Sequence, residues 1–304
     1  MDRILIVGTG ALANLFGARL SEAGFQVVML GTWEEGLVAL REHGIRLESP
    51  EGVRRYKVQV ATGPEALEGI RYALVLVKSW QTARAARQLS EALAQDGIAL
   101  SLQNGLGNRE TLAGELGEMR AAQGVTTTGA TLLGPAHVRP GGEGIISVGD
   151  HPRLPPLVDA LRTSGFEVET VADVNALIWK KLLINVAINP LTAILGVPNG
   201  RLLESDAARK LMALAVQEVE EVAEAYGIAL GFDDPLALAE KVAKKTAKNR
   251  SSMLQDISRG APTEIDAICG AVYRAGRDQG VSTPVNHTLT LLVKSLVDLK
   301  GKNR

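Results

Sequence analysis

The sequence has one cysteine, only four histidines and no excess of charge of either sign. A single cysteine, Cys269, excludes an internal disulfide framework and any CxxC metal or redox pair. The histidines show no HxxxH or HExxH spacing, which would place two ligands on one helix face, so we expect no metal site. Lysine and arginine number 33 against 34 aspartates and glutamates, so no overall field draws the chain to nucleic acid or an anionic membrane.

The N-terminal region also lacks a long apolar segment. Its first apolar stretch, Ile4 to Val7, is too short for a signal-peptide core or a membrane span. We therefore expect a soluble cytoplasmic protein with no membrane partner. The basic run from Lys241 to Arg250 has no interleaved aromatic residues, so we interpret it as the solvated face of a helix and expect no nucleic-acid partner.

The pattern of apolar residues divides the chain in two. At 304 residues and 46% hydrophobic, the chain is long enough for two domains. Up to about residue 170, short apolar runs alternate with helical patterns, as in βαβ units with a mostly parallel sheet. The expected strands are Ile4 to Val7, Val27 to Leu30, Ala73 to Val77, Ile98 to Leu102, Ile145 to Val148 and Phe166 to Val171. The glycine-rich stretch Gly134 to Gly144 predicts a loop and hairpin.

After Asp173 the pattern changes to long helical periodicity, as in Leu211, Leu214, Ala215, Glu218 and Val222. We therefore predict an α/β protein with two domains. Residues 1–170 are expected to form a domain with a mostly parallel sheet, and residues 171–304 an all-α domain.

The turn after the first strand carries the evidence for a dinucleotide. It reads Gly8, Thr9, Gly10, Ala11, Leu12, Ala13, a GxGxxA sequence that opens a helix. Gly8 permits the tight turn, Gly10 lets the backbone approach a pyrophosphate, and Ala13 allows close packing of helix on strand. The helix N-terminus then offers amide donors and a positive dipole end to the anion.

The end of the second strand leaves the choice of cofactor open. An acidic residue there bonds a ribose 2′-hydroxyl, and a basic one accommodates a 2′-phosphate. Here Thr32 follows the strand and Glu34 comes late for the acidic role, so neither pattern is met.

A polar stripe in the second domain is the clearest chemical signal. Lys181, Asn185 and Asn189 stand at i, i+4 and i+8 among apolar residues, so a continuous helix presents them on one side. A lysine in a partly desolvated cleft can serve as a proton donor. The alternative is that Lys181 extends to water while the asparagines bond neighbouring helices.

A second polar group follows at Asn249, Ser252 and Asp256, with Glu264 beyond it. Thr263 is the expected N-cap of a helix whose first turn contains Glu264. On that reading Glu264 serves either as a partner of the helix dipole or as a catalytic group.

Together these motifs resemble the ketopantoate reductase (2-dehydropantoate 2-reductase) family across nearly the whole chain. The segments that carry the resemblance are the GxGxxA turn, Lys78-Ser79-Trp80-Gln81, Gln103-Asn104-Gly105, WKKLLINVAINPLTAI, Pro198-Asn199-Gly200, Asn249 to Asp256 and Thr263 to Asp266. The resemblance implies reduction of 2-dehydropantoate to pantoate, toward pantothenate and coenzyme A. It also implies that residues 1–170 form a Rossmann-type dinucleotide-binding domain and that residues 171–304 form a helical substrate-binding and catalytic domain.

The resemblance also implies roles for individual residues. Lys181 matches the family's general acid, and Glu264 matches the residue that engages the substrate hydroxyl and the cofactor side of the site. The residues that match substrate-binding groups are Asn185, Asn189, Asn199, Asn249 and Ser252. The residues that match the cofactor site are Gly8, Thr9, Gly10, Ala11, Leu12, Ala13, Thr32, Lys78, Gln81, Asn104 and Glu264.

The same resemblance favours NADPH over NADH as the cofactor. Members of the family bind the 2′-phosphate of NADPH with an arginine and a lysine. Lys78 matches the lysine, whereas Thr32 stands where the arginine is expected. Two other functions stay open: a related β-hydroxyacid or 2-ketoacid reductase that acts on another small acid, and a non-catalytic dinucleotide sensor. A homodimer is the oligomeric state considered, and the sequence does not determine it.

Overall fold

The computed structural model describes residues 3–67 and 69–301; the expected domains also include residues 1, 2, 68 and 302–304, which lie outside the described part. The chain divides into two compact units. The first runs to Gln103 and resumes with Asn108–Val174, and the second comprises Asn104–Gly107 and the chain from Asn175 onward. The domain boundary expected at residue 170 stays a prediction.

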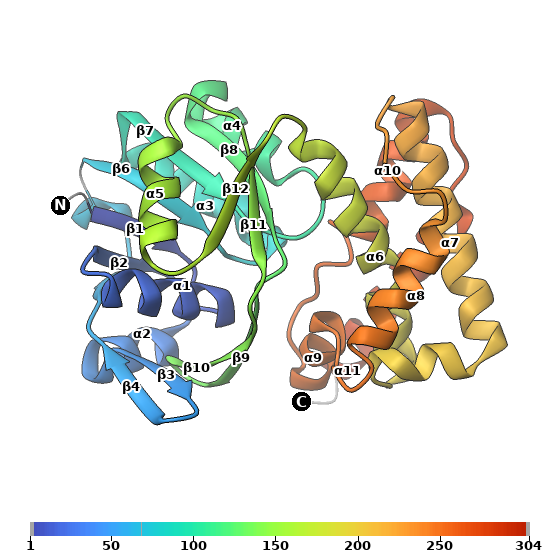
Figure 1. The fold of residues 1–304 in the computed structure, drawn as a ribbon, viewed down its shortest axis with the longest axis horizontal. Coiled ribbons are helices and arrows are strands. Elements are labelled where there is room, and N and C mark those ends of the chain that lie inside the picture. Colours follow the sequence, from blue (N-terminus) through green and yellow to red (C-terminus); the bar gives the residue numbers. More distant parts are fainter. Residues whose placement is uncertain (1–2, 68, 302–304) are drawn as a thin grey trace. The chain divides into compact units, whose positions relative to one another are not determined.

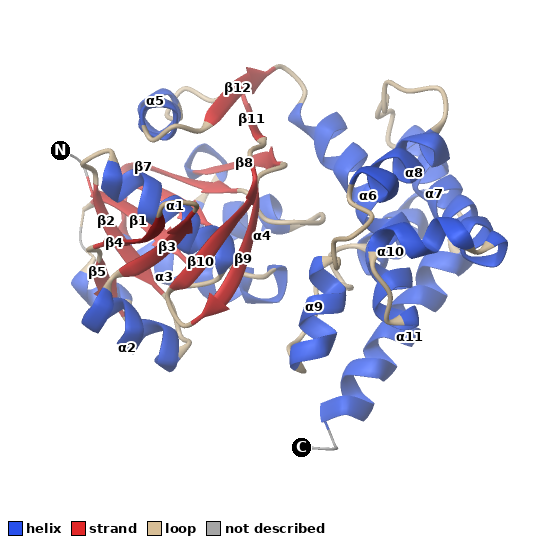
Figure 2. Ribbon diagram, turned by 60° about the horizontal axis from the view of Figure 1, so that its bottom comes forward, coloured by secondary structure: helices blue, strands red, loops and turns tan. Residues whose placement is uncertain are grey.

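The first unit is built on an eight-stranded sheet with the order β12-β11-β8-β7-β6-β1-β2-β5 (Figures 1 and 2). Its strands are β1 (Arg3–Val7), β2 (Gln26–Leu30), β5 (Gln59–Ala61), β6 (Ile70–Val75), β7 (Leu93–Ser101), β8 (Ala121–Thr126), β11 (Ile145–Gly149) and β12 (Glu167–Val171). Neighbouring strands pair in parallel except β8 and β11, which are antiparallel. Each of the six expected strands overlaps a strand of this sheet, so the predicted fold class is confirmed.

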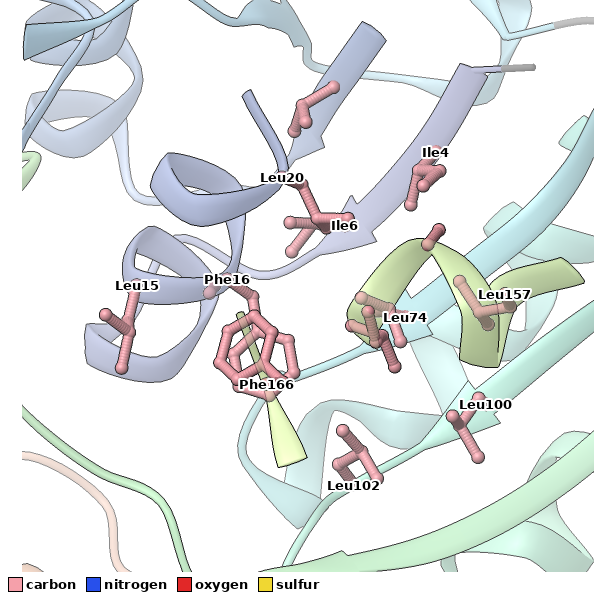
Figure 3. Packing of buried hydrophobic residues seen from close by; sticks show 14 of the residues in the cluster. Ile4, Ile6, Leu15, Phe16, Leu20, Leu74, Leu100, Leu102, Leu157 and Phe166 are labelled. Atoms are coloured by element: carbon pink, nitrogen blue, oxygen red, sulfur yellow. The ribbon is translucent and has the colours of Figure 1, made fainter. Parts of the chain in front are cut away.

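Helices cover both faces of this sheet, which explains why its central strands carry continuous buried apolar runs, such as Ile4 to Val7 in β1 and Val27 to Leu30 in β2. The helices of this unit are α1 (Ala11–Glu22), α2 (Glu34–His43), α3 (Thr82–Ala92), α4 (Asn108–Leu116) and α5 (Pro155–Thr163), with short 3-10 turns η1 (Pro64–Ala66), η2 (Ser79–Gln81) and η3 (Glu118–Arg120). Along β1, Ile4 and Ile6 pack with α1 and α5, while Leu5 and Val7 pack with α3 and α4. Phe16 of α1 stacks on Phe166 in this core, with ring centroids 4.3 Å apart (Figure 3).

A second, four-stranded sheet has the order β4-β3-β10-β9. Its strands are β3 (Ile45–Ser49), β4 (Gly52–Tyr56), β9 (Gly129–Gly134) and β10 (His137–Gly142). The hairpin expected within Gly134 to Gly144 is confirmed as the β9–β10 turn, whereas most of that stretch is strand β10 rather than a loop. The β3–β4 hairpin was not predicted, because β4 is exposed over most of its length and carries arginines rather than a buried apolar run.

Among the described residues after Asn175, the second unit consists of helices joined by loops, with no strand (Figure 2). It contains α6 (Val174–Leu195, whose first residue ends the first unit), η4 (Asn199–Glu204), α7 (Asp206–Ala225), α8 (Pro235–Lys245), α9 (Ser252–Arg259), α10 (Cys269–Gln279) and α11 (Pro284–Gly301). Helix α6 is long and apolar enough to cross a membrane, but it is mostly buried and its apolar side chains belong to the core of this unit. Cys269 is also buried in this core.

The helix predicted from the periodicity in α7 is confirmed, and Ala215, Glu218 and Val222 of the expected stripe are buried. Leu211 and Leu214 are exposed, whereas Met212, Ala215 and Val219 are buried. Leu211 lies beside Leu195 and Leu292 around a shallow apolar hollow on this unit.

Candidate active site

The expected phosphate-binding turn joins β1 to α1. Gly8 adopts a φ of +133°, which glycine tolerates and other residues rarely adopt, and a Cβ there would lie 3.0 Å from the carbonyl oxygen of Leu76. Its amide donates to the carbonyl of Leu30 over 2.7 Å, which ties the turn to the end of β2. Ala13 is fully buried, as close packing of α1 on the sheet requires.

Gly10 shows that the turn suits a ligand rather than only a tight bend. It is the N-cap of α1, with a φ of −79°, and nothing lies within 4 Å of the place where its Cβ would be. The fold itself therefore does not require a glycine here, but close approach by a pyrophosphate does. No acidic residue stands in the first turn of α1, so its amides and positive dipole end suit an anion.

Asn14 supports this turn and was missed by the sequence analysis. Its side chain is fully buried, and Nδ2 donates to the carbonyl oxygens of Thr9 and Gly10 over 2.9 and 2.8 Å. These two bonds fix the carbonyls of the turn, so the amides that alternate with them face the other way. The signal in the sequence was an asparagine at an otherwise apolar helical position.

Thr32 lies exposed after β2, where the adenosine ribose of a dinucleotide is expected. The following helix, α2, begins with two carboxylates, Glu34 and Glu35, and the indole Nε1 of Trp33 donates to Glu35 over 2.9 Å. The negative charge at this position opposes a 2′-phosphate and is compatible with a ribose hydroxyl.

Lys78 is half-buried in the turn between β6 and η2, and both neighbouring carbonyls are held by side chains. Gln103 Nε2 donates to Val77 O over 2.9 Å and to Thr82 Oγ1 over 2.8 Å, while Thr82 Oγ1 donates to Ser79 O over 2.8 Å. This network fixes the backbone on each side of Lys78. Gln103 was predicted only as part of a motif, and no pattern in the sequence pointed to Thr82.

Most of the residues expected at the cofactor site follow three neighbouring strands. The GxGxxA turn follows β1, Thr32 follows β2, and Lys78 and Gln81 follow β6; these strands are adjacent and parallel in the order β6-β1-β2. The carboxyl ends of parallel strands meet at one edge of a sheet, where open α/β folds bind their ligands.

The polar stripe of the second unit lies on one continuous helix, as predicted. Lys181, Asn185 and Asn189 all belong to α6, with Lys181 and Asn185 half-buried and Asn189 buried. Burial lowers the pKa of Lys181 to about 8 from its ordinary value of 10.5, and the negative charge of Glu264 opposes part of this shift. A lysine with this pKa holds a proton at neutral pH and releases it more readily than an exposed one.

Glu264 is buried and accepts a hydrogen bond from Asn104 Nδ2 over 3.1 Å. The backbone brings the two together: Leu106 N donates to Ala267 O, and a Cβ on Gly105, whose φ is +84°, would lie 2.2 Å from that same oxygen. The expectation that Glu264 lies in the first turn of a helix is wrong. Helix α10 begins only at Cys269, and Glu264 lies in the turn before it.

The other expected substrate residues lie on two segments of the second unit, one at the start of η4 and one at the start of α9. Asn249 is exposed in the turn before α9, and Ser252 is the exposed first residue of α9. Asn199 is buried at the start of η4, where its backbone amide donates to Asn249 O over 3.0 Å and its Nδ2 donates to Thr246 Oγ1 over 2.9 Å. The structure thus brings Asn199 and Asn249 together through the backbone.

Two further observations concern metal binding and the reactivity of the cysteine. No group of three or more His, Cys, Asp or Glu side chains in residues 3–67 and 69–301 is arranged to hold a metal ion. Burial also raises the pKa of the Cys269 thiol, which makes it a poor nucleophile.

Comparison with known proteins gives one family for both units. The model described as "Ketopantoate reductase PanE/ApbA" matches residues 4–153, and "Ketopantoate reductase PanE/ApbA C terminal" matches residues 173–297. The 2-dehydropantoate 2-reductase of Halobacterium salinarum is 36% identical over 96% of this chain and 98% of its own length. That of Archaeoglobus fulgidus is 35% identical over 97% of this chain and 98% of its own.

Solved structures agree with this similarity. A ketopantoate reductase from Ralstonia eutropha JMP134 is 32% identical, with a TM-score of 0.91 over 98% of this chain and 99% of its own. A D-mandelate dehydrogenase in a ternary structure with NADH and anilino(oxo)acetate is 27% identical, with a TM-score of 0.92 over 97% of this chain and 98% of its own.

Proposed function

Because the chain belongs to the ketopantoate reductase family, we propose that it reduces 2-dehydropantoate to (R)-pantoate, in the pathway to pantothenate and coenzyme A. On this proposal it is an oxidoreductase acting on a CH–OH group, and it works in the cytoplasm. The single observation that carries the proposal is the lowered pKa of Lys181 beside Glu264 on a helix that also presents Asn185 and Asn189.

The turn from Gly8 to Ala13 fits a dinucleotide, because Gly10 leaves open space at a helix N-terminus that has no acidic residue. Thr32, Lys78 and Gln81 would hold the adenosine part, and Asn104 would lie near the nicotinamide. A reduced nicotinamide, when bound, supplies the hydride that adds to the carbonyl carbon of the substrate.

Lys181 acts as the general acid. Its ammonium group stabilises the negative charge that develops on the carbonyl oxygen and then transfers a proton from Nζ to that oxygen, which completes the alcohol. Burial supports this role because an ammonium in a site of low dielectric stabilises an alkoxide more strongly than one in water.

Glu264 engages the substrate hydroxyl and keeps Lys181 charged, since its carboxylate raises the pKa that burial lowers. Asn104 orients that carboxylate through its hydrogen bond to Oε2. The substrate carboxylate and hydroxyl are bound by amides and a hydroxyl, which discriminate strongly against analogues that lack a bonding group. These substrate-binding residues are Asn185, Asn189, Asn199, Asn249 and Ser252.

NADPH is the preferred cofactor and NADH the weaker one. Lys78 supplies a cation on a fixed turn, and the Thr32 hydroxyl supplies a donor. The carboxylates of Glu34 and Glu35 reduce the preference, so it is smaller than for a site with an arginine in place of Thr32.

A parallel assay tests reaction and cofactor together. Initial rates are measured at the nicotinamide absorbance band with 2-dehydropantoate and with phenylglyoxylate, the keto acid of mandelate, each with NADPH and with NADH. We expect the highest kcat/KM for 2-dehydropantoate with NADPH. Faster turnover of the other keto acid contradicts the substrate, and equal or faster turnover with NADH contradicts the cofactor preference alone. Absence of turnover with either substrate supports the dinucleotide sensor instead.

The oligomeric state of the enzyme is a separate question. We propose a homodimer, and light scattering at assay concentrations should give twice the mass of one chain. A mass of one chain at those concentrations contradicts the dimer without affecting the proposed reaction.

A further inference from the structure

A buried hydroxyl pair joins the helix of the polar stripe to the helix that begins with Ser252. Thr192 lies on α6, three residues after Asn189, and is fully buried. Its Oγ1 lies 2.7 Å from Oγ of Ser251, which is the N-cap of α9 and accepts from Leu254 N over 3.1 Å. The residue that follows this cap, Ser252, is the exposed one.

The Oγ1 of Thr192 has hydrogen-bond partners other than Ser251. Its Oγ1 also lies 2.8 Å from Ile188 O and 3.0 Å from Asn189 O, and a helical threonine commonly bonds only such carbonyls of its own helix. The bond to Ser251 is therefore an additional link between two elements that are 59 residues apart in sequence.

The same segment is held at its other end by the turn that follows α6. Asn199 Nδ2 donates to Thr246 Oγ1, and the amides of Asn199 and Gly200 donate to the carbonyls of Asn249 and Ala247. A Cβ on Gly200 would lie 2.5 Å from that of Ala247, so the two backbones approach closely. Residues 246–252 are thus attached at both ends to the chain that carries the stripe.

We propose that Thr192 is a positioning residue for the substrate site: it holds the segment from Asn249 to Ser252 against α6 and so sets the separation between the Ser252 hydroxyl and the Asn189 amide. This rests on the proposed function, in which Asn189 and Ser252 bind the substrate. A fixed separation between these two groups favours binding of one small acid. A site whose groups become ordered only on binding loses conformational entropy and therefore binds its ligand more weakly.

Removing the hydroxyl without changing the shape of the side chain tests this role. Thr192→Val should raise the KM for 2-dehydropantoate about tenfold, the effect of one lost hydrogen bond, while leaving the KM for NADPH unchanged. Thr192→Ser keeps the hydroxyl and should restore the KM. If valine prevents folding, Thr192→Ala removes the hydroxyl without placing a methyl beside the carbonyls.

Thr290→Val is the matched control. Thr290 is also buried in a helix of this unit, and its Oγ1 donates to Asn286 O of its own helix over 2.8 Å. This variant should keep both KM values, even if it lowers the melting temperature as much as Thr192→Val does. An equal KM in the two valine variants, or no rescue by Thr192→Ser, overturns the proposal.

Hydrogen exchange separates a failure of this inference from a failure of the proposed function. Amides of residues 249–255 should exchange faster in Thr192→Val than in the wild type or in Thr290→Val, whatever substrate the enzyme uses. Unchanged exchange there overturns the positioning role. An inactive wild type with the expected exchange pattern instead contradicts the proposed reaction and leaves the link between α6 and α9 in place.

Discussion

Lys180 and Lys181 are neighbours in sequence, yet their surroundings differ. The Nζ of Lys180 lies 5.6 Å from the ring centroid of Phe232, whereas Lys181 has a pKa lowered by burial and shares an electrostatic interaction with Glu264. Successive residues on a helix point about 100° apart, so only one of the two belongs to the stripe with Asn185 and Asn189. Alanine variants of these two lysines therefore form a matched pair.

Lys181→Ala should lower kcat by about 10²- to 10⁴-fold, because the proton donor and the positive charge at the developing alkoxide are both lost. Lys180→Ala should change kcat little. Steady-state kinetics with NADPH and 2-dehydropantoate measures both variants. Comparable losses in the two variants would contradict the assignment of Lys181 as the acid.

The pH dependence of kcat/KM follows from the same lysine. Lys181 must carry its proton to act as an acid, so activity is retained below its pKa of about 8 and falls, about tenfold per unit, as pH rises above it. Glu264→Gln removes a charge that raises this pKa, so the fall should move to lower pH, on top of a lower rate. A midpoint that stays in place or moves up would show that the titrating group is not Lys181.

At the scale of elements, α7 and α11 are joined by a buried carboxylate at a helix N-terminus. Glu218 of α7 accepts hydrogen bonds from the amides of Val285 and Asn286 over 2.7 and 2.8 Å, and from Asn286 Nδ2 over 2.8 Å. Asn286 Nδ2 also donates to Ala215 O over 3.0 Å. The carboxylate satisfies amides that no intrahelical carbonyl can reach and interacts favourably with the helix dipole.

Glu218→Gln should lower the free energy of unfolding by about 1–3 kcal/mol, because it weakens charge-assisted bonds and leaves a buried group poorly paired. Glu220→Gln, at an exposed position of the same helix, should change it by less than about 0.5 kcal/mol. Urea unfolding measures both. Equal midpoints for the two variants would mean that this carboxylate does not stabilise the contact between α7 and α11.

For the whole molecule, cofactor binding should stabilise the folded state. A ligand at 100 times its Kd adds about 2.7 kcal/mol when it binds only the folded chain. At equal concentrations, NADPH should raise the melting temperature more than NADH does, because Lys78 favours the 2′-phosphate. Thr32→Arg should widen that difference, since it adds the missing cation, and a larger shift with NADH in both proteins would contradict the preference.

The sequence by itself determined the fold class and much of the chemistry. Six of the eight strands of the large sheet were predictable, because helices cover both of its faces and its central strands carry buried apolar runs; β5 and β8 were not predicted. The GxGxxA turn and the Lys181, Asn185 and Asn189 stripe were predictable because local periodicity fixes which residues share a turn or a helix face. The exposed β3–β4 hairpin has no such pattern, and it was missed.

Only the tertiary structure decided which distant residues work together. Asn104 meets Glu264 across 160 residues, Thr192 meets Ser251 across 59, and Gln103 reaches the carbonyl before Lys78 across 26. Local patterns carry no information about such pairs, because each partner is an ordinary polar residue in its own segment. The same limit applies at Glu264: a sequence that resembles a helix cap forms a turn, and the carbonyl of Ala267 in that turn accepts from Leu106 N, a partner that the local sequence does not encode.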